Sequence, residues 1–233
     1  MTTKRVLFGL IGKKLGHSFS PGYFSEKFRN EGIDAQYLAF ELEHIRNFPD
    51  LINEQQALRG LNVTIPYKQA VIPFLDHISP EAKAVGAVNT ILISESGELT
   101  GYNTDVTGFQ EGLKKAWHKS AIDQAVVLGS GGAAQAVLFV LKNWLGVKRP
   151  LVVSRSPQAG HIGYPDLRML QAEDFDLLIN TSPIGMHPDF HQAPDFPYSV
   201  LNNRHLAYDL IYNPSETMFL TKAKSREQRL KMA

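Results

Sequence analysis

The 233-residue chain contains no cysteine. This absence excludes disulfide bonds, thiolate catalysis and cysteine zinc sites, and it is consistent with a reducing cytoplasm. Net charge is also nearly absent: the formal value is +1, so no strong field attracts nucleic acid or an anionic membrane. We therefore expect a cytoplasmic protein with no nucleic-acid partner and no membrane partner.

Long hydrophobic runs are also lacking. The apolar stretch near the amino terminus, Val6–Ile11, is about a third of the length needed to cross a bilayer. It ends in Gly12 and two lysines, without the small-residue cleavage site of a signal peptide. The stretch therefore predicts a buried strand. The eight histidines show no paired spacing, so we expect no metal site.

Short β-rich runs alternate with amphipathic stretches, a pattern typical of α/β layering. In the first half, Pro21–Glu31 is expected to be a helix with Ser20 as its N-cap and Pro21 as its first residue. Ser96-Gly97 predicts a hairpin turn. The strands expected in this half are Val6–Ile11, Tyr37–Glu41, Leu61–Ile65, Ala87–Ser94 and Glu98–Tyr102.

A second α/β unit is expected after a joining helix at Val106–His118. Its first strand, Ala125–Leu128, is entirely apolar, as in a parallel sheet buried on both faces. Helix Ala133–Leu145 and strands Leu151–Val153, Phe175–Ile179 and Leu206–Ile211 are expected to follow. A last helix should start after Asn213, with Asn213 capping it and Glu216 in the reciprocal position.

A glycine-rich turn, Gly129-Ser130-Gly131-Gly132-Ala133-Ala134, stands between the expected strand and helix of the second unit. It fits the G-x-G-x-x-G/A dinucleotide fingerprint, in which one glycine permits a tight turn and another lets the backbone approach a pyrophosphate. The helix N-terminus then offers unpaired N–H groups to the phosphates. A glycine-rich turn without a ligand is the alternative.

The next strand ends in Ser154-Arg155-Ser156, where an NAD site usually carries an acidic residue. Arg155 can pair with the 2′-phosphate of NADP(H), while Ser154 and Ser156 add hydrogen bonds. A carboxylate at this turn would repel that phosphate, and none is present. The residues therefore predict NADP(H) as the cofactor, unless Arg155 merely ends a strand.

Polar residues crowd the carboxyl ends of the strands expected in the first half, where open α/β sheets bind ligands. Taken alone, each has an ordinary structural explanation, such as a helix cap or a solvated charge. The clusters are His17-Ser18-Phe19-Ser20-Pro21, Asn62-Val63-Thr64-Ile65-Pro66-Tyr67-Lys68, Gly86-Ala87-Val88-Asn89-Thr90 and Asn103-Thr104-Asp105.

In this order and spacing, the clusters resemble the shikimate dehydrogenase family, with its S-x-S-P, N-V-T-x-P-[FY]-K, G-A-V-N-T, N-T-D and G-x-G-G-A motifs. The likeness continues through Asn180–Met186 and Asp209–Pro214 and covers roughly residues 6 to 222. The resemblance implies an N-terminal open α/β substrate domain (residues 1–104) and a Rossmann-like doubly wound dinucleotide-binding domain (residues 105–212). Residues 213–233 are expected to return to the first domain.

The family pattern also implies the roles of individual residues. It implies that Ser18 and Ser20 bind the substrate carboxylate and that Tyr212 makes a further substrate contact. It implies that ring hydroxyls are held by Asn62, Thr64, Asn89 and Asp105. The cofactor contacts that it implies are Gly129, Gly131, Gly132, Ala133, Arg155, Thr181 and Met186.

The implied chemistry is a hydride transfer between nicotinamide and a ring carbon, with a proton moving on its oxygen. Lys68 and Asp105 are the expected acid/base pair. Burial would lower the lysine pKa from its reference of about 10.4, whereas an anionic neighbour would raise it. We assign the proton transfer to Lys68 and its orientation to Asp105, with the reverse assignment open.

The last residues depart from the family pattern. Lys224–Ala233 is a basic run, whereas the family continues with a G-L-x-M-L segment and a substrate-binding Gln. A frameshift is one hypothesis, which predicts weak substrate affinity with preserved cofactor binding. The sequence supports three functional hypotheses: an active NADPH-dependent enzyme of aromatic amino acid biosynthesis, a quinate/shikimate dehydrogenase using NAD, and a truncated, inactive ligand-binding relative. A monomer or a homodimer is expected.

Overall fold

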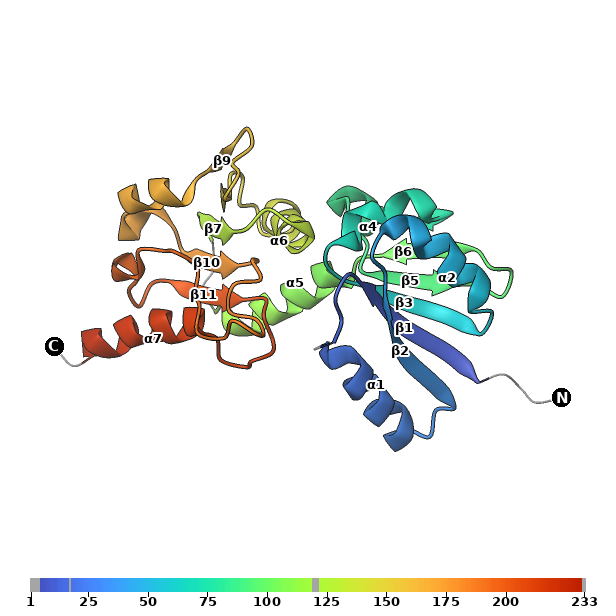
Figure 1. Ribbon diagram of the computed structural model, residues 1–233. Helices are drawn as coiled ribbons and strands as arrows, with labels where there is room; N and C mark the ends of the chain where they lie inside the picture. The colour runs from blue at the N-terminus through green and yellow to red at the C-terminus, as the bar shows by residue number, and fades with distance from the viewer. Residues whose placement is uncertain (1–4, 17, 119–121, 232–233) are drawn as a thin grey trace. The chain divides into compact units, whose positions relative to one another are not determined.

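The computed structural model describes residues 5–16, 18–118 and 122–231, with side chains up to Ser225. His17, which was predicted as part of the first polar cluster, lies outside the described residues, as do Met232 and Ala233 of the basic run. The chain divides into two compact units, Met1–Thr104 and Asp105–Ala233 (Figure 1). Each unit is built around its own sheet.

The first unit contains a six-stranded mixed sheet in the order β2-β1-β3-β5-β6-β4. Strand β1 pairs in parallel with β2 and β3, whereas β5 is antiparallel to both β3 and β6. Gly97, with φ +90°, provides the turn between β5 and β6. The strands are β1 (Val6–Gly12), β2 (Ala35–Glu41), β3 (Leu58–Val63), β4 (His77–Ile78), β5 (Thr90–Ile93) and β6 (Leu99–Tyr102).

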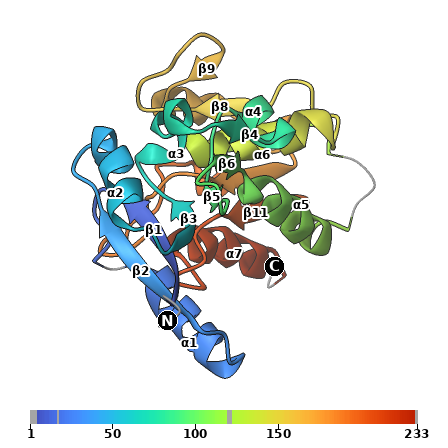
Figure 2. The same ribbon diagram turned by 90° about the vertical axis from the view of Figure 1, so that its right-hand side faces the viewer.

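Helices cover this sheet on both faces (Figures 1 and 2). Side chains alternate along β1, so Leu10 faces the rings of Phe24 and Phe28 from α1, while Ile11 packs in the core that holds Phe48 of α2. The helices are α1 (Phe19–Asn30), α2 (Phe48–Glu54), α3 (Tyr67–Ala70) and α4 (Pro80–Val85), with 3-10 turns η1 (Ile45–Asn47) and η2 (Ile72–Phe74).

The second unit contains a five-stranded parallel sheet in the order β11-β10-β7-β8-β9. The chain runs outward from β7 in one direction and then returns to its other side, which is the doubly wound order of a Rossmann-like fold. The strands are β7 (Ala125–Leu128), β8 (Leu151–Val153), β9 (His161–Ile162), β10 (Leu177–Asn180) and β11 (Leu206–Asp209). The predicted α/β fold class is confirmed.

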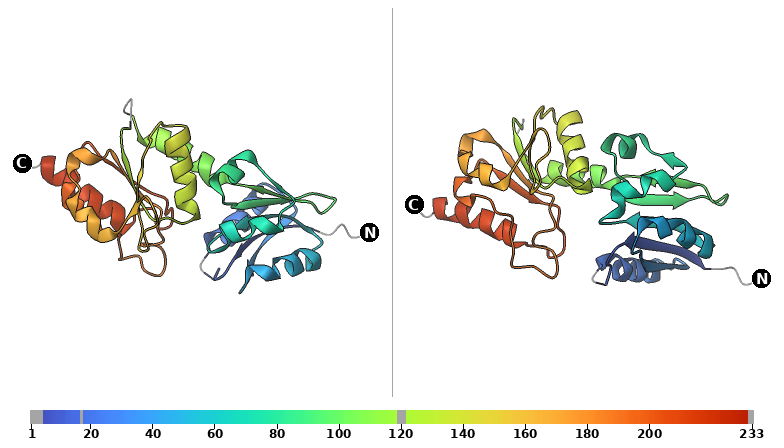
Figure 3. Two further views of the ribbon diagram at one scale, coloured as in Figure 1. Left: turned by 90° about the horizontal axis from the view of Figure 1, so that it is seen from above. Right: turned by 45° about the horizontal axis from the view of Figure 1, so that its top comes forward.

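Helices α6 and α7 lie on opposite sides of this sheet in both views of Figure 3. Strand β7 is buried along its whole length, which explains its continuous apolar sequence. Beyond α5 (Thr104–Ala116), α6 (Gly132–Asn143) and α7 (Met218–Lys231), the unit has three 3-10 segments: η3 (Tyr164–Met169), η4 (Ala172–Asp174) and η5 (Tyr198–Val200).

Two expected helix caps, Ser20 and Asn213, are wrong. Helix α1 begins at Phe19 with Ser18 at the N-cap position, so Ser20 lies within the first turn. Pro21 is accommodated there because the first-turn N–H groups have no intrahelical partner. Helix α7 begins at Met218, and the hydroxyl of Thr217, not the side chain of Asn213, accepts a hydrogen bond from Leu220 N at 3.4 Å.

The expected return of residues 213–233 to the first domain is also wrong. These residues belong to the second unit, where α7 packs on β11 and η5. Phe219 is fully buried in the core that contains Val126 and Leu178. Helical backbone continues to Lys231, beyond the point at which the apolar pattern ends. No helix within the described ranges has the length and apolar character needed to cross a membrane.

Candidate active site

A chain of hydrogen-bonded polar side chains runs across the strand ends of the first unit. Tyr37 donates to Asn62 Oδ1 at 2.7 Å, and Asn62 Nδ2 donates to Thr90 Oγ1 at 3.3 Å. Thr90 donates to Asn89 Oδ1 at 3.1 Å, and that oxygen also accepts from Thr104 N at 2.9 Å. Two of the predicted substrate residues, Asn62 and Asn89, are therefore brought together through Thr90.

Strand pairing explains this proximity. Asn62 and Thr90 are directly opposite each other in the β3–β5 ladder, so their side chains share one face of the sheet. Asn89 is buried, with 8 % exposure, and its own backbone carbonyl accepts from Val63 N at 2.8 Å. A buried amide is tolerated because it is hydrogen-bonded.

Lys68 lies on the short helix α3, directly after β3, and is half-buried. Its carbonyl accepts from Val88 N at 2.7 Å, which ties the lysine backbone to the segment that carries Asn89. Thr64 lies at the end of the same strand, where its N–H donates to Ile11 O at 2.9 Å. The structure thus gathers Lys68, Thr64 and the two asparagines around the carboxyl ends of β1 and β3.

Ser18 and Ser20 lie at the start of α1, and both are half-buried. The Ser18 hydroxyl makes no capping bond, and its N–H donates to Leu15 O at 2.8 Å. None of the hydrogen bonds described for these two serines joins them to Asn62 or Asn89. Their predicted role in holding a carboxylate stays a prediction.

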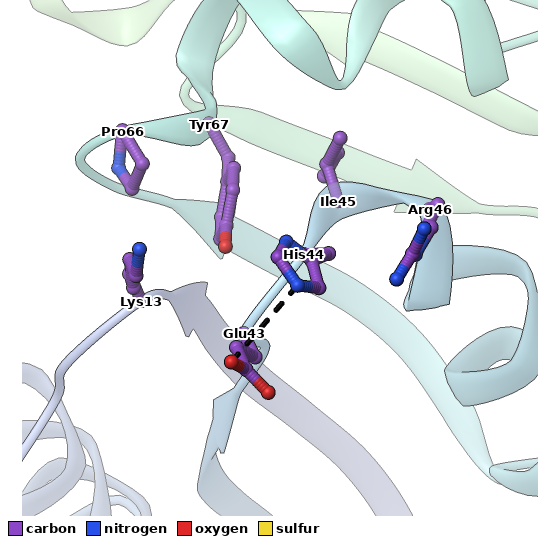
Figure 4. A pocket seen from close by; sticks show the side chains of 7 residues that line it. All are labelled: Lys13, Glu43, His44, Ile45, Arg46, Pro66 and Tyr67. Carbon is purple, nitrogen blue, oxygen red and sulfur yellow. Dashed lines mark ion pairs between the residues drawn. The ribbon is translucent and has the colours of Figure 1, made fainter.

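A shallow pocket of about 350 Å³ lies beside this region, at the carboxyl ends of β1 and β2 (Figure 4). Apart from the buried Tyr67, which donates to Leu42 O at 2.6 Å, its polar side chains are exposed. It is lined by Lys13, Glu43, His44, Ile45, Arg46, Pro66 and Tyr67. None of the predicted substrate residues lines this pocket, so it does not mark the predicted substrate site.

In the second unit, the glycine turn joins β7 to α6. Gly129 has φ +117°, and a Cβ there would lie 2.6 Å from Thr181 Oγ1, so only glycine fits. Gly131 is the N-cap residue of α6, and a Cβ there would meet nothing within 4 Å. Gly132 and Ala133 form the first turn. The unpaired N–H groups of this turn and the open space beside Gly131 fit a pyrophosphate.

The turn after β8 carries Ser154, Arg155 and Ser156. Ser154 is buried, and its hydroxyl lies 3.2 Å from that of Ser130 in the glycine turn, so it joins the two turns. Ser156 N donates to Ser154 Oγ at 3.3 Å. Arg155 is exposed and makes no ion pair or hydrogen bond with the described residues. An exposed guanidinium beside a glycine turn fits the 2′-phosphate of NADP(H).

Thr181 follows β10, and both its N–H and its hydroxyl donate to Leu128 O at 2.9 Å. These bonds fix the loop after β10 beside the glycine turn, at the point where the strand order reverses. Met186 is exposed on the same loop, after Gly185 with φ +101°. Tyr212 is 70 % exposed on the loop after β11.

Asp105 is half-buried in the first turn of α5, at the start of the second unit. Lys68 belongs to the first unit. Their pairing in an acid/base couple therefore stays a prediction. Among the described residues, no group of three or more His, Asp or Glu side chains is placed to hold a metal ion.

Two features of the site were missed from the sequence. Thr90 belongs to a predicted polar cluster, but its bridging role depends on the strand register, which short alternating runs do not specify. Asp209 was noted only as part of a motif. In the structure, its carboxylate accepts bonds from Asn180 and Thr217, and burial raises the pKa of Asp209. An acidic residue at the end of the last strand of the sheet was the available signal.

Comparison with known proteins identifies similar chains. Residues 10–91 match the model of the shikimate dehydrogenase substrate binding domain. The chain is 40 % identical to the shikimate dehydrogenase (NADP(+)) of Clostridium beijerinckii, over 96 % of this chain and 84 % of the relative.

Two solved structures are similar along nearly the whole chain. Shikimate 5-dehydrogenase from Thermus thermophilus, in complex with NADP(H) and shikimate, has a TM-score of 0.78 and 33 % identity, covering 95 % of this chain and 84 % of that one. Quinate dehydrogenase from Corynebacterium glutamicum, in complex with NAD, has a TM-score of 0.82 and 30 % identity, covering 95 % and 85 %.

Proposed function

This chain belongs to the shikimate dehydrogenase family, and from that premise we propose that it reduces 3-dehydroshikimate to shikimate with NADPH. The reaction is a reversible hydride transfer in aromatic amino acid biosynthesis. The Clostridium relative, which is named for NADP(+), and the Thermus structure with NADP(H) and shikimate both support this proposal.

The observation that carries the proposal is the polar chain Asn62–Thr90–Asn89 in the first unit. A ring polyol with one carboxylate needs neutral donors and acceptors, and a site built from them rejects analogues that leave buried polar groups unpaired. The matched substrate-binding region contains Asn62 and Asn89. Ser18 and Ser20 are proposed for the carboxylate, and Thr64, Asp105 and Tyr212 for further substrate contacts.

For the cofactor, we propose NADP(H), with its pyrophosphate against Gly131, Gly132 and Ala133 and its 2′-phosphate beside Arg155. No acidic residue stands at this turn to repel the phosphate or to accept from a free ribose hydroxyl. Thr181 and Met186 lie on the neighbouring loop after β10. When bound, the nicotinamide supplies or accepts the hydride.

Within the protein, Lys68 handles the proton. As a cation, it donates a proton to the oxygen of the ring carbon that receives the hydride, which leaves an alcohol and a neutral amine. In the reverse direction, the neutral amine takes the hydroxyl proton while the hydride leaves. Asp105 is proposed to orient Lys68, and the assignment with their roles exchanged is the alternative.

Two other functions make different predictions. The quinate dehydrogenase that resembles this chain binds NAD, and a quinate/shikimate enzyme using NAD would oxidise quinate with that cofactor. Arg155, in place of an acid, argues against this alternative. An inactive ligand-binding relative would bind NADP+ without turnover. The cytoplasmic location and the monomeric or dimeric state remain predictions.

The test is to follow cofactor oxidation or reduction with four combinations of substrate and cofactor. We expect turnover of 3-dehydroshikimate with NADPH and of shikimate with NADP+. We expect much lower rates for 3-dehydroshikimate with NADH and for quinate with NAD+. A preference for quinate with NAD+ would support the alternative enzyme. NADP+ binding by calorimetry without turnover would support the inactive relative.

A further inference from the structure

Asp209, at the end of β11, accepts hydrogen bonds from three different segments of the second unit. Its Oδ1 accepts from Asn180 Nδ2 at 3.1 Å and from Ile211 N at 3.0 Å. Its Oδ2 accepts from Thr217 Oγ1 at 2.6 Å. One carboxylate therefore joins the end of β10, the loop after β11 and the start of α7.

Asn180 connects Asp209 to the loop after β10 through hydrogen bonds. Because its Nδ2 donates to Asp209, its Oδ1 is turned toward Ser182 and accepts from both Ser182 N at 3.0 Å and Ser182 Oγ at 2.7 Å. Ile184 N then lies 3.4 Å from Ser182 Oγ. The amide orientation set by Asp209 thus fixes the turn that leads to Met186.

The same loop lies against the other partners of the carboxylate. A Cβ built on Gly185 would lie 3.7 Å from Ile211 Cδ1 and 3.8 Å from Thr217 Cβ. Asn180 and Thr217 are both fully buried. Buried polar groups that satisfy one another rigidify their surroundings, whereas breaking one leaves a costly unpaired group. This hydrogen-bonded set, Asn180, Ser182, Asp209 and Thr217, is here termed the Asp209 network.

We infer that Asp209 is a positioning residue that sets two contact-bearing loops at once, through this network. One loop carries Thr181 and Met186, proposed for the cofactor, and the other carries Tyr212, proposed for the substrate. The inference rests on the proposed function for the identity of both ligands. A carboxylate suits this place because it accepts from several donors and itself competes for no acceptor.

The test compares Thr217, the residue that precedes α7, with Thr221, which lies one turn later within the helix. Thr217→Val removes the donor to Asp209 and the 3.4 Å acceptor of Leu220 N, whereas Thr221→Val removes only a hydroxyl that donates to Thr217 O at 3.1 Å. The readout is the ¹³C-methyl resonance of Met186 in the ligand-free chain, assigned among the five methionines with Met186→Leu. We expect the resonance to shift in Thr217→Val, to stay in place in Thr221→Val and to return in Thr217→Ser.

Binding and kinetics provide a second readout. In Thr217→Val we expect Kd for NADP+ and KM for shikimate both to rise roughly tenfold, as for the loss of a hydrogen bond to a charged group. Ser182→Ala cuts the network on its half-buried side, so it should shift the Met186 resonance and raise the NADP+ Kd even if Thr217→Val does not fold.

An unshifted Met186 resonance in Thr217→Val or Ser182→Ala would overturn the inference, as would an equal shift in Thr221→Val. The methyl experiment needs no ligand and no turnover. If the wild-type chain fails to oxidise shikimate, the proposed function fails, and the resonance still decides whether Asp209 positions the loop.

Discussion

The predicted sites of the two units are ordered by different interactions. In the first unit, hydrogen bonds between side chains on neighbouring strands order the site, and they join Tyr37, Asn62, Thr90 and Asn89. In the second unit, the backbone has the larger share, through the left-handed Gly129 and the open first turn of α6. We therefore expect substrate recognition to depend on side-chain chemistry, and pyrophosphate binding to depend on backbone geometry, with Arg155 as the side chain that selects between NADP+ and NAD+.

This difference predicts separable effects of mutation. A side-chain change in the first unit should alter substrate turnover and leave cofactor affinity intact. A backbone change at the glycine turn should weaken cofactor affinity and leave substrate affinity intact. The Asp209 network is the exception in the second unit, because its side chains set the backbone of two loops.

The largest expected effect is on catalysis in the first unit. Lys68→Ala should lower kcat by about 100-fold or more, the usual range for loss of a general acid–base group, with a modest change in shikimate KM. Steady-state kinetics with NADP+ measures both. If kcat survives and KM alone rises, Lys68 binds substrate and the proton carrier lies elsewhere.

Asn89→Ala breaks the polar chain. It leaves Thr104 N and the hydroxyls of Thr90 and Thr104 without their acceptor, so we expect about 1–3 kcal/mol of lost unfolding free energy. Shikimate kcat/KM should fall as well, while the NADP+ Kd stays constant. Urea unfolding and calorimetry test the two halves of this prediction. Weaker NADP+ binding in Asn89→Ala would contradict the proposal that substrate turnover and cofactor affinity are affected separately.

Gly129→Ala tests the backbone half. Its φ of +117° and the 2.6 Å approach of the new Cβ to Thr181 Oγ1 should cost about 1–3 kcal/mol of stability and weaken NADP+ binding. Gly131→Ala is the matched control: its Cβ meets nothing within 4 Å, so stability should hold while NADP+ binding weakens. Unchanged NADP+ affinity in Gly131→Ala would contradict the proposal that the pyrophosphate binds at this turn.

The smallest effect concerns pH. Burial raises the pKa of Asp209, so the folded chain keeps a proton on this carboxyl up to a higher pH than the unfolded chain does. Its contribution to stability is present below the unfolded pKa and is lost as pH rises through the raised folded pKa. Relative to Asp209→Asn, the wild type should therefore lose a small part of its stability as the pH rises above the ordinary aspartate pKa of about 3.9, and solvent screens part of the effect. Parallel Tm-against-pH curves would contradict this.

Much of the fold could be predicted from the sequence where the pattern is strong. Strands Ala125–Leu128 and Leu151–Val153 have the predicted bounds, because a strand buried on both faces is continuously apolar. Short helices without a full apolar period, such as Phe48–Glu54, were missed. Pro80–Val85 was missed too, although Ser79 as its N-cap and Gly86 after it were visible signals.

Tertiary packing decides what local patterns cannot. Asn213 looked like a helix cap, yet α7 starts at Met218, where Thr217 is buried against Asp209 and Phe219 enters the core of the second unit. The stabilisation from a helix cap, about 1 kcal/mol, is smaller than the free energy gained by burying a phenylalanine side chain. For the site, residue types indicated Asn62 and Asn89, whereas Thr90 required the strand register and Asp209 required the packed loops.

The most direct measurement of the central claim is the ratio of kcat/KM for shikimate oxidation with NADP+ to that with NAD+, in the wild type and in Arg155→Ala. The account predicts a ratio well above one for the wild type. It also predicts a fall of roughly 10- to 100-fold in Arg155→Ala, which corresponds to a lost charged hydrogen bond of about 1–3 kcal/mol, with the NAD+ rate almost unchanged. A wild-type ratio at or below one, or equal losses with both cofactors, would contradict it.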